Sequence, residues 1–312
     1  MNRDYVYKRI YECGIMPTTF VYDLEETVEL AKTIHANGIH IIELLQRTPD
    51  ALEAISVVKK AVPGMIVGAG TVLNVETAEK VWKQGADYIV SPYYHQDIID
   101  WCNEHELAVV PGCASITEVS HGYDSGLRCF KYFPTNELGG MSVIRQISEI
   151  YADARYVATG GITFPQLMEY STSRYIAAVG SVCMMPQKLI DAHAWDEIAR
   201  LCRQAVAASL GLELVYAGEL LGPALNDNIR LFAESRNNCS EIPVKLLEMG
   251  DKPDMVFYTN SVDRALAHFA EKGMEGSIIK MADAVSAAVA DVIDPTGGKR
   301  IRLIARHYIY RI

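Results

Sequence analysis

The chain has 312 residues, half of them hydrophobic, which is enough for one large domain and a smaller one. Its formal net charge of −10 argues against nucleic acid or an anionic membrane as a partner, but not against a local positive pocket. Seven cysteines without a CxxC pair are typical of reduced thiols, and the first residues resemble neither a secretory signal nor a membrane span. We therefore expect a cytoplasmic protein that binds neither nucleic acid nor a membrane.

Eight short apolar segments recur along the first two hundred residues, and each is typical of a buried strand. Between them lie segments whose apolar residues recur at i, i+3 and i+4, which predicts amphipathic helices, several of them ending at glycine. A further helix is predicted over residues 2–13, before the first strand. The strand segments are IMPTTFVY (15–22), HIIELL (40–45), MIVGAG (65–70), DYIVSP (87–92), LAVVPG (107–112), RCFKYFP (128–134), RYVATGG (155–161) and YIAAVGS (175–181).

Strands that alternate with helices pair in parallel through crossover connections, and two architectures have this pattern. One is a doubly wound open sheet, and the other is a (β/α)8 barrel. No GxGxxG follows the first strand, which weakens the nucleotide-binding open sheet. The count of eight therefore favours an α/β fold with a (β/α)8 TIM barrel over residues 1–210, in which helix 2–13 closes the bottom.

The last hundred residues, 211–312, predict a small α+β domain that follows a final barrel helix over 186–211. The strand-like segments include 212–218, 228–235, 244–250 and 254–260. One strong helix lies between Ser261, which can cap it, and Gly273, which can end it. DPTGGK is expected to be a turn between strands rather than a P-loop, because its lysine lacks the GKS/T context.

Catalytic residues of a (β/α)8 barrel come from the C-terminal ends of its strands. Reactive and small residues occupy these ends, so they should converge on one rim, where Pro92 and Phe133 are expected to form the pocket wall. The residues at the strand ends are Glu43, Arg47, Gly70, Thr71, Ser91, Pro92, Pro111, Gly112, Lys131, Phe133, Thr159, Gly160, Gly161, Gly180 and Ser181.

Lys131 stands in an apolar strand segment, on the face opposite Phe130 and Tyr132. Two interpretations compete: a lysine that snorkels at a strand end, and a desolvated amine that forms a Schiff base with a ketone. Apolar surroundings and a nearby cation would favour the neutral amine. The presence of Glu43 and Arg47 on the same rim favours the second interpretation, with Glu43 as the proton shuttle.

The two ends of a substrate can be assigned to different parts of the rim. Arg47 with the Thr71 hydroxyl can hold the carboxylate of a 2-keto acid, although Glu43 and Arg47 could instead form a surface ion pair at i, i+4. No histidine spacing or acidic cluster typical of a metal site accompanies them, so we expect neither metal nor cofactor. Small residues after the last two strands are predicted to bind phosphate through backbone N–H groups; they are Thr159, Gly160, Gly161, Gly180 and Ser181.

Seven segments, from about Ile15 to Pro186, resemble in order and spacing the bacterial 2-keto-3-deoxy-6-phosphogluconate aldolases, which also cleave 4-hydroxy-2-oxoglutarate. They are IIELLQRTPDALEAI, IVGAGTVLN, GADYIVSP, VVPGCASITE, FKYFPTNELGG, ATGGIT and VGS…MP. The resemblance implies a metal-independent class I aldolase that forms a homotrimer. It also implies a role for each matching residue: Lys131 as the Schiff-base lysine, Glu43 as the general acid/base, Arg47 and Thr71 as carboxylate ligands, and Gly160, Gly161 and Ser181 as phosphate ligands.

Three places depart from the family pattern. Tyr93 and Tyr94 stand where glycine usually follows SP, Asn136 replaces a carboxylate, and Val182 replaces a tryptophan. The two tyrosines could narrow the pocket mouth or pack a subunit contact. These departures affect the choice of substrate more than the type of reaction.

The resemblance implies a lyase of carbohydrate metabolism that cleaves a 2-keto-3-deoxy-6-phospho sugar acid to pyruvate and glyceraldehyde 3-phosphate. It also implies cleavage of 4-hydroxy-2-oxoglutarate to pyruvate and glyoxylate. A catalytically silent phosphosugar-binding barrel, acting as a scaffold or sensor, is one alternative, and a phosphosugar epimerase is another. Neither explains a lysine at an apolar strand end beside a keto-acid arginine.

In the tail, the segment TNSVDRALAHFAEKGME resembles one βαβββ unit of the vicinal-oxygen-chelate, or glyoxalase-like, fold. Such units bind metals through histidine and glutamate side chains on strands. Here Met255 occupies a strand position where histidine is often found, and His307 stands alone. We therefore expect the tail to serve assembly, stability or regulation by a ligand rather than chemistry.

Overall fold

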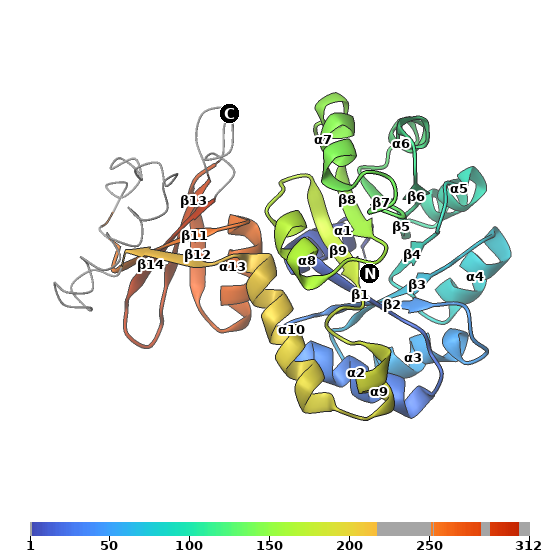
Figure 1. Ribbon diagram of the computed structural model, residues 1–312, viewed down its shortest axis with the longest axis horizontal. Helices are drawn as coiled ribbons and strands as arrows, with labels where there is room; N and C mark the ends of the chain where they lie inside the picture. Colours follow the sequence, from blue (N-terminus) through green and yellow to red (C-terminus); the bar gives the residue numbers. More distant parts are fainter. Residues whose placement is uncertain (1, 217–250, 252, 282–287, 306–312) are drawn as a thin grey trace. The chain divides into compact units, whose positions relative to one another are not determined.

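The structure is a computed structural model that describes residues 2–216, 251, 253–281 and 288–305 (Figure 1). The chain divides into two compact units, Met1–Ser209 and Leu210–Ile312. The strand segments expected at 228–235 and 244–250, together with Cys239 and His307, lie outside the described residues.

The first unit contains nine parallel strands in the order β5-β4-β3-β2-β1-β9-β8-β7-β6. β5 and β6 are two parts of one barrel strand, separated by Pro111, which has no N–H to donate to a ladder. Because these two parts stand at opposite ends of the order, the sheet closes on itself. The predicted eight-stranded barrel is confirmed. The strands are β1 (Ile15–Thr19), β2 (Ile41–Leu45), β3 (Ile66–Gly70), β4 (Tyr88–Val90), β5 (Ala108–Val110), β6 (Gly112–Cys113), β7 (Cys129–Tyr132), β8 (Arg155–Thr159) and β9 (Ile176–Ser181).

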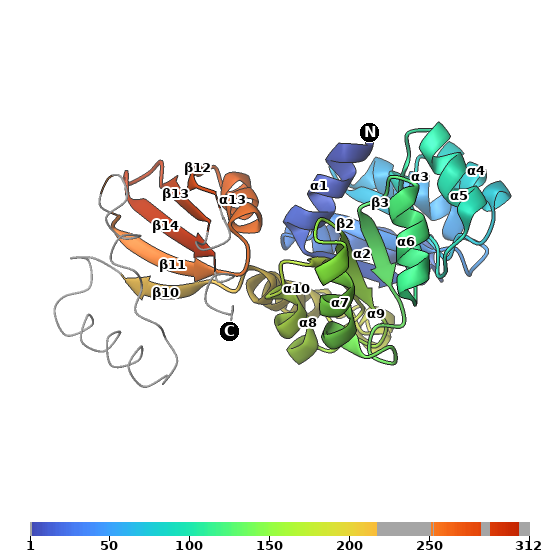
Figure 2. The same ribbon diagram turned by 90° about the horizontal axis from the view of Figure 1, so that it is seen from above.

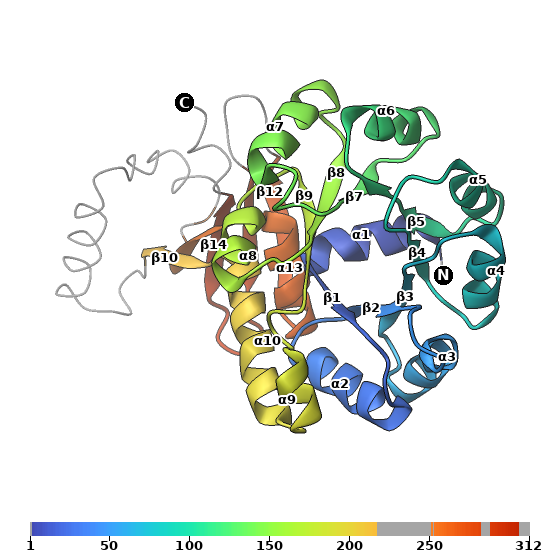
Figure 3. The same cartoon turned by 45° about the vertical axis from the view of Figure 1, so that its right-hand side comes forward.

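Helices alternate with the strands and surround the barrel, as Figure 3 shows. The single helix expected over 186–211 is wrong, because the chain leaves the helical conformation around His193, at φ 49°, and forms α9 and α10 instead. The helices are α2 (Leu24–Ala36), α3 (Ala51–Ala61), α4 (Val75–Lys83), α5 (Gln96–Glu104), α6 (Ile116–Asp124), α7 (Gly140–Ile150), α8 (Phe164–Ser171), α9 (Gln187–Asp191) and α10 (Trp195–Leu210).

Helix α1 (Arg3–Cys13) precedes the first strand and lies at the centre of the ring in Figure 3. Val6 and Ile10 are fully buried in the inner core, together with Met16 and Ile41 from the first two strands. The α1 side chains thus fill one end of the barrel interior.

Strand alternation separates an inner core from an outer core between strands and helices. On β7, Phe130 and Tyr132 belong to the outer core, whereas Cys129 belongs to the inner core with Val157 of β8. Lys131 shares the face of Cys129 and points into the barrel, as alternation predicts.

Two further observations concern the described helices and cysteines. Among the helices that the structure describes, none is both long and apolar enough to span a bilayer. The six described cysteines are free thiols, and burial raises the pKa of Cys102, Cys129 and Cys202 to about 12.

The second unit is built on a five-stranded mixed sheet in the order β10-β11-β14-β13-β12. Helix α13 (Val262–Glu271) connects β11 to β12 and packs against β12, β13 and β14 (Figure 2). Counted from β11, the elements follow the βαβββ order, and β11 and β14 are parallel. The relation of this unit to glyoxalase-like proteins stays a prediction. The strands are β10 (Glu213–Tyr216), β11 (Met255–Thr259), β12 (Glu275–Lys280), β13 (Val289–Ile293) and β14 (Arg300–Ala305).

Local sequence explains the ends of these elements. The Ser261 hydroxyl accepts a hydrogen bond from the N–H of Arg264 at the start of α13. Gly273, at φ 77°, follows the helix end. The segment DPTGGK forms the turn between β13 and β14, where the Asp294 carboxylate accepts hydrogen bonds from the N–H and hydroxyl of Thr296. All three features agree with the sequence expectation.

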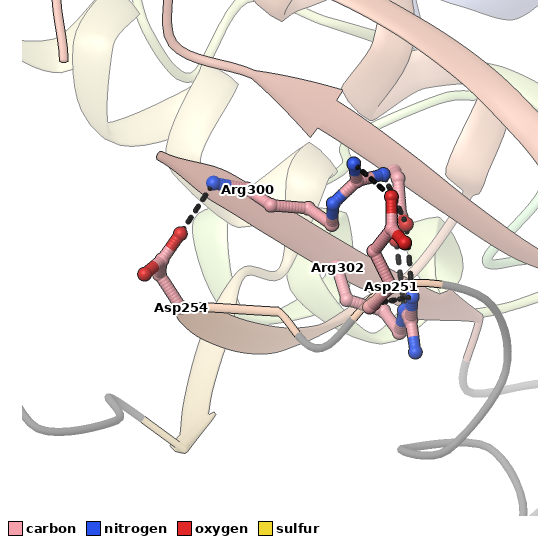
Figure 4. Close-up of polar contacts among 5 residues, drawn as sticks. Asp251, Asp254, Arg300 and Arg302 are labelled. Atoms are coloured by element: carbon pink, nitrogen blue, oxygen red, sulfur yellow. Dashed lines mark hydrogen bonds and ion pairs between the residues drawn. The ribbon is translucent and has the colours of Figure 1, made fainter. Parts of the chain in front are cut away.

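A buried ion pair joins the neighbouring strands β13 and β14, and it belongs to the cluster of polar contacts around Arg300 and Arg302 in Figure 4. Arg302 is fully buried and donates two hydrogen bonds of 2.8 Å to the carboxylate of Asp291, which is 5% exposed. Arg302 also donates to the carbonyl of Asp251, and Arg300 contacts the carboxylates of both aspartates. Bidentate geometry and these additional bonds compensate the guanidinium for lost hydration.

We predict that Asp291→Ala destabilises the protein by about 3–5 kcal/mol, because it leaves the buried Arg302 charge without its carboxylate. Urea unfolding followed by far-UV circular dichroism measures the effect. The control is Glu197→Ala, which breaks an exposed Arg–Glu pair on α10 and should change stability little. Equal effects of the two substitutions would contradict the assignment of a structural role to Asp291.

Candidate active site

The site centres on Lys131, which β7 directs into the barrel. Its Nζ lies 3.3 Å from Oε1 of Glu43 on β2, and the two residues are 6% and 0% exposed. The same Nζ lies 5.3 Å from the centroid of the Phe133 ring. An amine and a carboxylate this close can exchange a proton, directly or through one water.

The Glu43 carboxylate has one oxygen committed to Lys131 and one with no hydrogen-bond partner in the described part of the chain, Oε2. A Cβ on Gly70 of β3 would lie 2.2 Å from Glu43 Oε1 and 2.7 Å from its Cγ. Glycine at position 70 therefore leaves the space that the Glu43 side chain occupies. The unpartnered Oε2 is available to a proton donor that enters the site.

Arg47 and Thr71 meet beside this pair, after β2 and β3. Arg47 Nε donates a 2.9 Å hydrogen bond to the Thr71 hydroxyl, and its guanidinium carbon lies 5.7 Å from the centroid of the Phe20 ring. Thr71 has φ 60°, which is rare for a β-branched residue and indicates local strain. Arg47 itself is exposed, so its remaining N–H donors face solvent at the rim.

The predicted wall residues Pro92 and Phe133 are both partly exposed at the ends of their strands. A Cβ on Gly112 would lie within 2.5 Å of the backbone of Pro92 and Tyr93, so Gly112 permits this close approach. Tyr93 is 44% exposed, and its hydroxyl donates to the carbonyl of Leu73. Tyr93 thus links two neighbouring loops at the rim.

Thr159 lies on the inner face of β8, because it follows Val157 of the inner core by two residues. Its hydroxyl is buried and has no hydrogen-bond partner among the described residues. A Cβ on Gly180 would lie 2.3 Å from this hydroxyl oxygen, so Gly180 makes room for it. The Thr159 hydroxyl is thus a barrel-interior group, whereas the expected phosphate contacts are backbone groups of the loops.

The loops after β8 and β9 contain the other predicted phosphate ligands. Gly160 and Gly161 have φ of 116° and 58°, which a residue with a side chain rarely adopts. The Ser181 hydroxyl donates to the carbonyl of Ile162 at 2.7 Å and accepts from the N–H of Cys183 at 3.0 Å. Since this hydroxyl has one proton, its hydrogen bond to Ile162 leaves none for a substrate phosphate.

Two residues near the pair were missed by the sequence interpretation. Thr18 of β1 is 8% exposed and aligns with Glu43 in the parallel ladder, which places its side chain on the same face. The alternation with Met16 could have found it. Tyr88 of β4 lies below the site, where its ring fills the space over Gly68 and its hydroxyl donates to the carbonyl of Ile42.

A buried amine, an adjacent carboxylate and a rim guanidinium can together perform imine chemistry on a ketone that carries a carboxylate. Among the described residues, no group of three or more His, Cys, Asp or Glu side chains is arranged to hold a metal ion. The contacts described above bring Lys131, Glu43, Arg47 and Thr71 together at the C-terminal ends of the strands, as the sequence predicts.

Comparison with known proteins gives a consistent set of similarities. The family model for KDPG (2-keto-3-deoxy-6-phosphogluconate) and KHG aldolases matches residues 6–201. A 2-dehydro-3-deoxy-phosphogluconate aldolase of Pseudoalteromonas atlantica is 34% identical over 198 residues, which cover 64% of this chain and 92% of that protein.

Solved structures show the same similarity. The KDPG aldolase of Legionella pneumophila, with pyruvate captured as a covalent carbinolamine intermediate, matches with a TM-score of 0.62 and 29% identity, over 64% of this chain and 97% of that chain. The KDPG aldolase of Zymomonas mobilis with 3-phosphoglycerate matches with a TM-score of 0.62 and 30% identity, over 65% and 95%.

We predict that Gly70→Ala displaces the Glu43 carboxylate from Lys131 and destabilises the barrel by about 1–3 kcal/mol, because the added methyl group overpacks the interior. A crystal structure and a thermal melt measure the two effects. Gly297→Ala is the control, since its nearest contact to an added Cβ is an ordinary 3.5 Å. An unchanged ion pair in Gly70→Ala would contradict the prediction.

Proposed function

Because the chain belongs to the KDPG and KHG aldolase family, we propose that it is a class I aldolase that cleaves a 2-keto-3-deoxy-6-phospho sugar acid. The products are pyruvate and glyceraldehyde 3-phosphate, and the enzyme also cleaves 4-hydroxy-2-oxoglutarate to pyruvate and glyoxylate. One observation carries the proposal: the buried 3.3 Å contact between Lys131 and Glu43 at the C-terminal end of the barrel.

The proposed reaction begins with attack of the neutral Lys131 amine on the C2 ketone. The carbinolamine loses water to give an iminium ion, and Glu43 moves the protons. Glu43 then accepts the proton of the C4 hydroxyl while the C3–C4 bond breaks and its electron pair forms the enamine. The aldehyde leaves, Glu43 returns a proton to C3, and hydrolysis of the resulting imine releases pyruvate and the free amine.

The two ends of the substrate have separate binding groups in this proposal. Arg47 and the Thr71 hydroxyl hold the carboxylate, and Phe20 supports the Arg47 guanidinium. The backbone of Gly160 and Gly161 receives the phosphate. Ser181 supports that loop through its hydrogen bond to the Ile162 carbonyl rather than through its own hydroxyl proton. Thr159, Gly180, Pro92 and Phe133 complete the pocket.

The remaining proposals concern the context of the enzyme. We assign it to a homotrimer on the family resemblance, and to the cytoplasm on that resemblance and on the free thiols of the six described cysteines. All residues used in the mechanism belong to the first unit, so the second unit serves assembly or stability. A silent scaffold is not favoured, because it would not need a buried lysine, an unpartnered carboxylate oxygen and a carboxylate-binding arginine together.

We predict that borohydride reduction in the presence of pyruvate leaves a stable adduct on Lys131, and that Lys131→Ala loses essentially all cleavage. Mass spectrometry of peptides locates the adduct, and a coupled pyruvate assay measures turnover. Lys80→Ala is the control, because that lysine forms an exposed pair on α4.

Two outcomes would refute the Schiff-base mechanism. One is an adduct on another residue, or none. The other is strong inhibition by EDTA that a divalent cation reverses, which would indicate a metal-dependent aldolase.

We predict that Glu43→Gln slows cleavage by roughly 10²–10⁴, because the amide cannot shuttle protons although it fills the same volume. Borohydride trapping at Lys131 should persist on a longer timescale, since the amine is still present. Glu76→Gln on the exposed face of α4 is the matched control. Cleavage within threefold of the native rate in Glu43→Gln would remove Glu43 from the mechanism.

A further inference from the structure

Asn136 lies five residues after Lys131, in the loop that follows β7, where the family pattern has a carboxylate. Its side chain makes three hydrogen bonds. Nδ2 donates to the carbonyl of Gly161 at 3.3 Å, and Oδ1 accepts from Gln166 Nε2 and from the Tyr170 hydroxyl, both at 3.0 Å. Asn136 therefore joins the loop after β7 to the glycine loop after β8 and to α8.

The backbone next to Asn136 makes this junction rigid. The N–H of Thr135 donates to the carbonyl of Thr159, and the Thr135 hydroxyl accepts from the N–H of Thr159, each at 2.8 Å. The Thr135 hydroxyl in turn donates to the carbonyl of Tyr132. A Cβ on Gly160 would lie 3.2 Å from Pro134, so the two loops are in close contact. Asn136 thus reaches Gly161 from a fixed position.

The hydrogen bond to Gly161 determines where the next backbone N–H points. The carbonyl of Gly161 and the N–H of Ile162 belong to one trans peptide unit and point in opposite directions. Asn136 fixes that carbonyl, and Ser181 fixes the following one, the carbonyl of Ile162. No group in the described part of the chain accepts the N–H of Ile162. The N–H is therefore held in one direction and is available to an external acceptor.

We propose that Asn136 is a positioning residue that orients the Gly161–Ile162 peptide so that its N–H binds the phosphate of the substrate. The proposal rests on the proposed function, because it concerns the phosphate end of that site. An amide suits this position, because it can donate to Gly161 and accept from Gln166 and Tyr170 at once. An aspartate at this position would set a carboxylate oxygen against the Gly161 carbonyl, where Asn136 places its N–H donor.

Asn136→Asp tests this role with almost no change of shape. The aspartate can still accept from Gln166 and Tyr170, so the fold of the loop is retained, but it cannot donate to Gly161. We expect KM for 2-keto-3-deoxy-6-phosphogluconate to rise by roughly tenfold or more, with kcat changed less than threefold. The KM for 4-hydroxy-2-oxoglutarate, which has no phosphate, should change less than twofold. Asn136→Ala, which adds no charge, should raise the first KM in the same direction by a smaller factor.

Asn103→Asp is the matched control. Asn103 lies on α5, is part-buried and hydrogen-bonded, and lies outside the proposed site, so the same chemical change there should leave both KM values within twofold. Equal losses of Asn136→Asp on both substrates would mean a general structural role and would overturn the proposal. Unchanged kinetics for Asn136→Asp would overturn it as well.

Binding of inorganic phosphate, measured by isothermal titration calorimetry, separates this proposal from the proposed function. If the native protein cleaves neither substrate, the aldolase assignment fails, but weaker phosphate binding by Asn136→Asp than by Asn103→Asp would still support the positioning role. Failure of the native protein to bind phosphate, or equal affinity in both variants, would overturn the positioning role even in an active aldolase.

Discussion

The buried contact between Lys131 and Glu43 is the constraint on which the rest of the barrel depends. Two long charged side chains need space in an interior that side chains normally fill. The space comes from β3, where Gly70 leaves room for Glu43 and Gly68 leaves room for the Tyr88 ring. A side chain at either glycine would collide with its neighbour, so the ion pair and the glycines form one packing unit.

The same principle organises the proposed phosphate end of the site, where hydrogen bonds rather than free volume set the geometry. Asn136 donates a hydrogen bond to the carbonyl of Gly161, and Ser181 donates one to the carbonyl of Ile162. In our proposal these contacts orient backbone N–H groups, which lose no side-chain entropy when they bind an anion. The proposed catalytic end is thus built from side chains, and the proposed phosphate end from backbone groups.

Much of this organisation could be predicted from the sequence, because it follows from periodicity. Apolar segments located the strands, and alternation along β7 put Lys131 on the inner face and Phe130 on the outer face. The division of the fifth strand at Pro111 and the break between α9 and α10 depend on local backbone geometry that apolar patterns do not report. The acceptor of the Ser181 hydroxyl could not be predicted either, since Ile162 lies in a loop nineteen positions away that only the fold brings close.

Helix α1 has a consequence for the order of events during turnover. Val6 and Ile10 of this helix lie in the inner core. The Tyr7 hydroxyl donates to the carbonyl of Val109 and accepts from its N–H, so the helix closes one end of the barrel. Substrate, products and water can then enter and leave the barrel only at the rim. In the proposed mechanism the aldehyde leaves and water enters through this same opening, while the pyruvate enamine stays covalently bound to Lys131. The aldehyde must therefore leave through the rim before water hydrolyses the imine and releases pyruvate. This order keeps the enamine bound to Lys131 until the aldehyde has left.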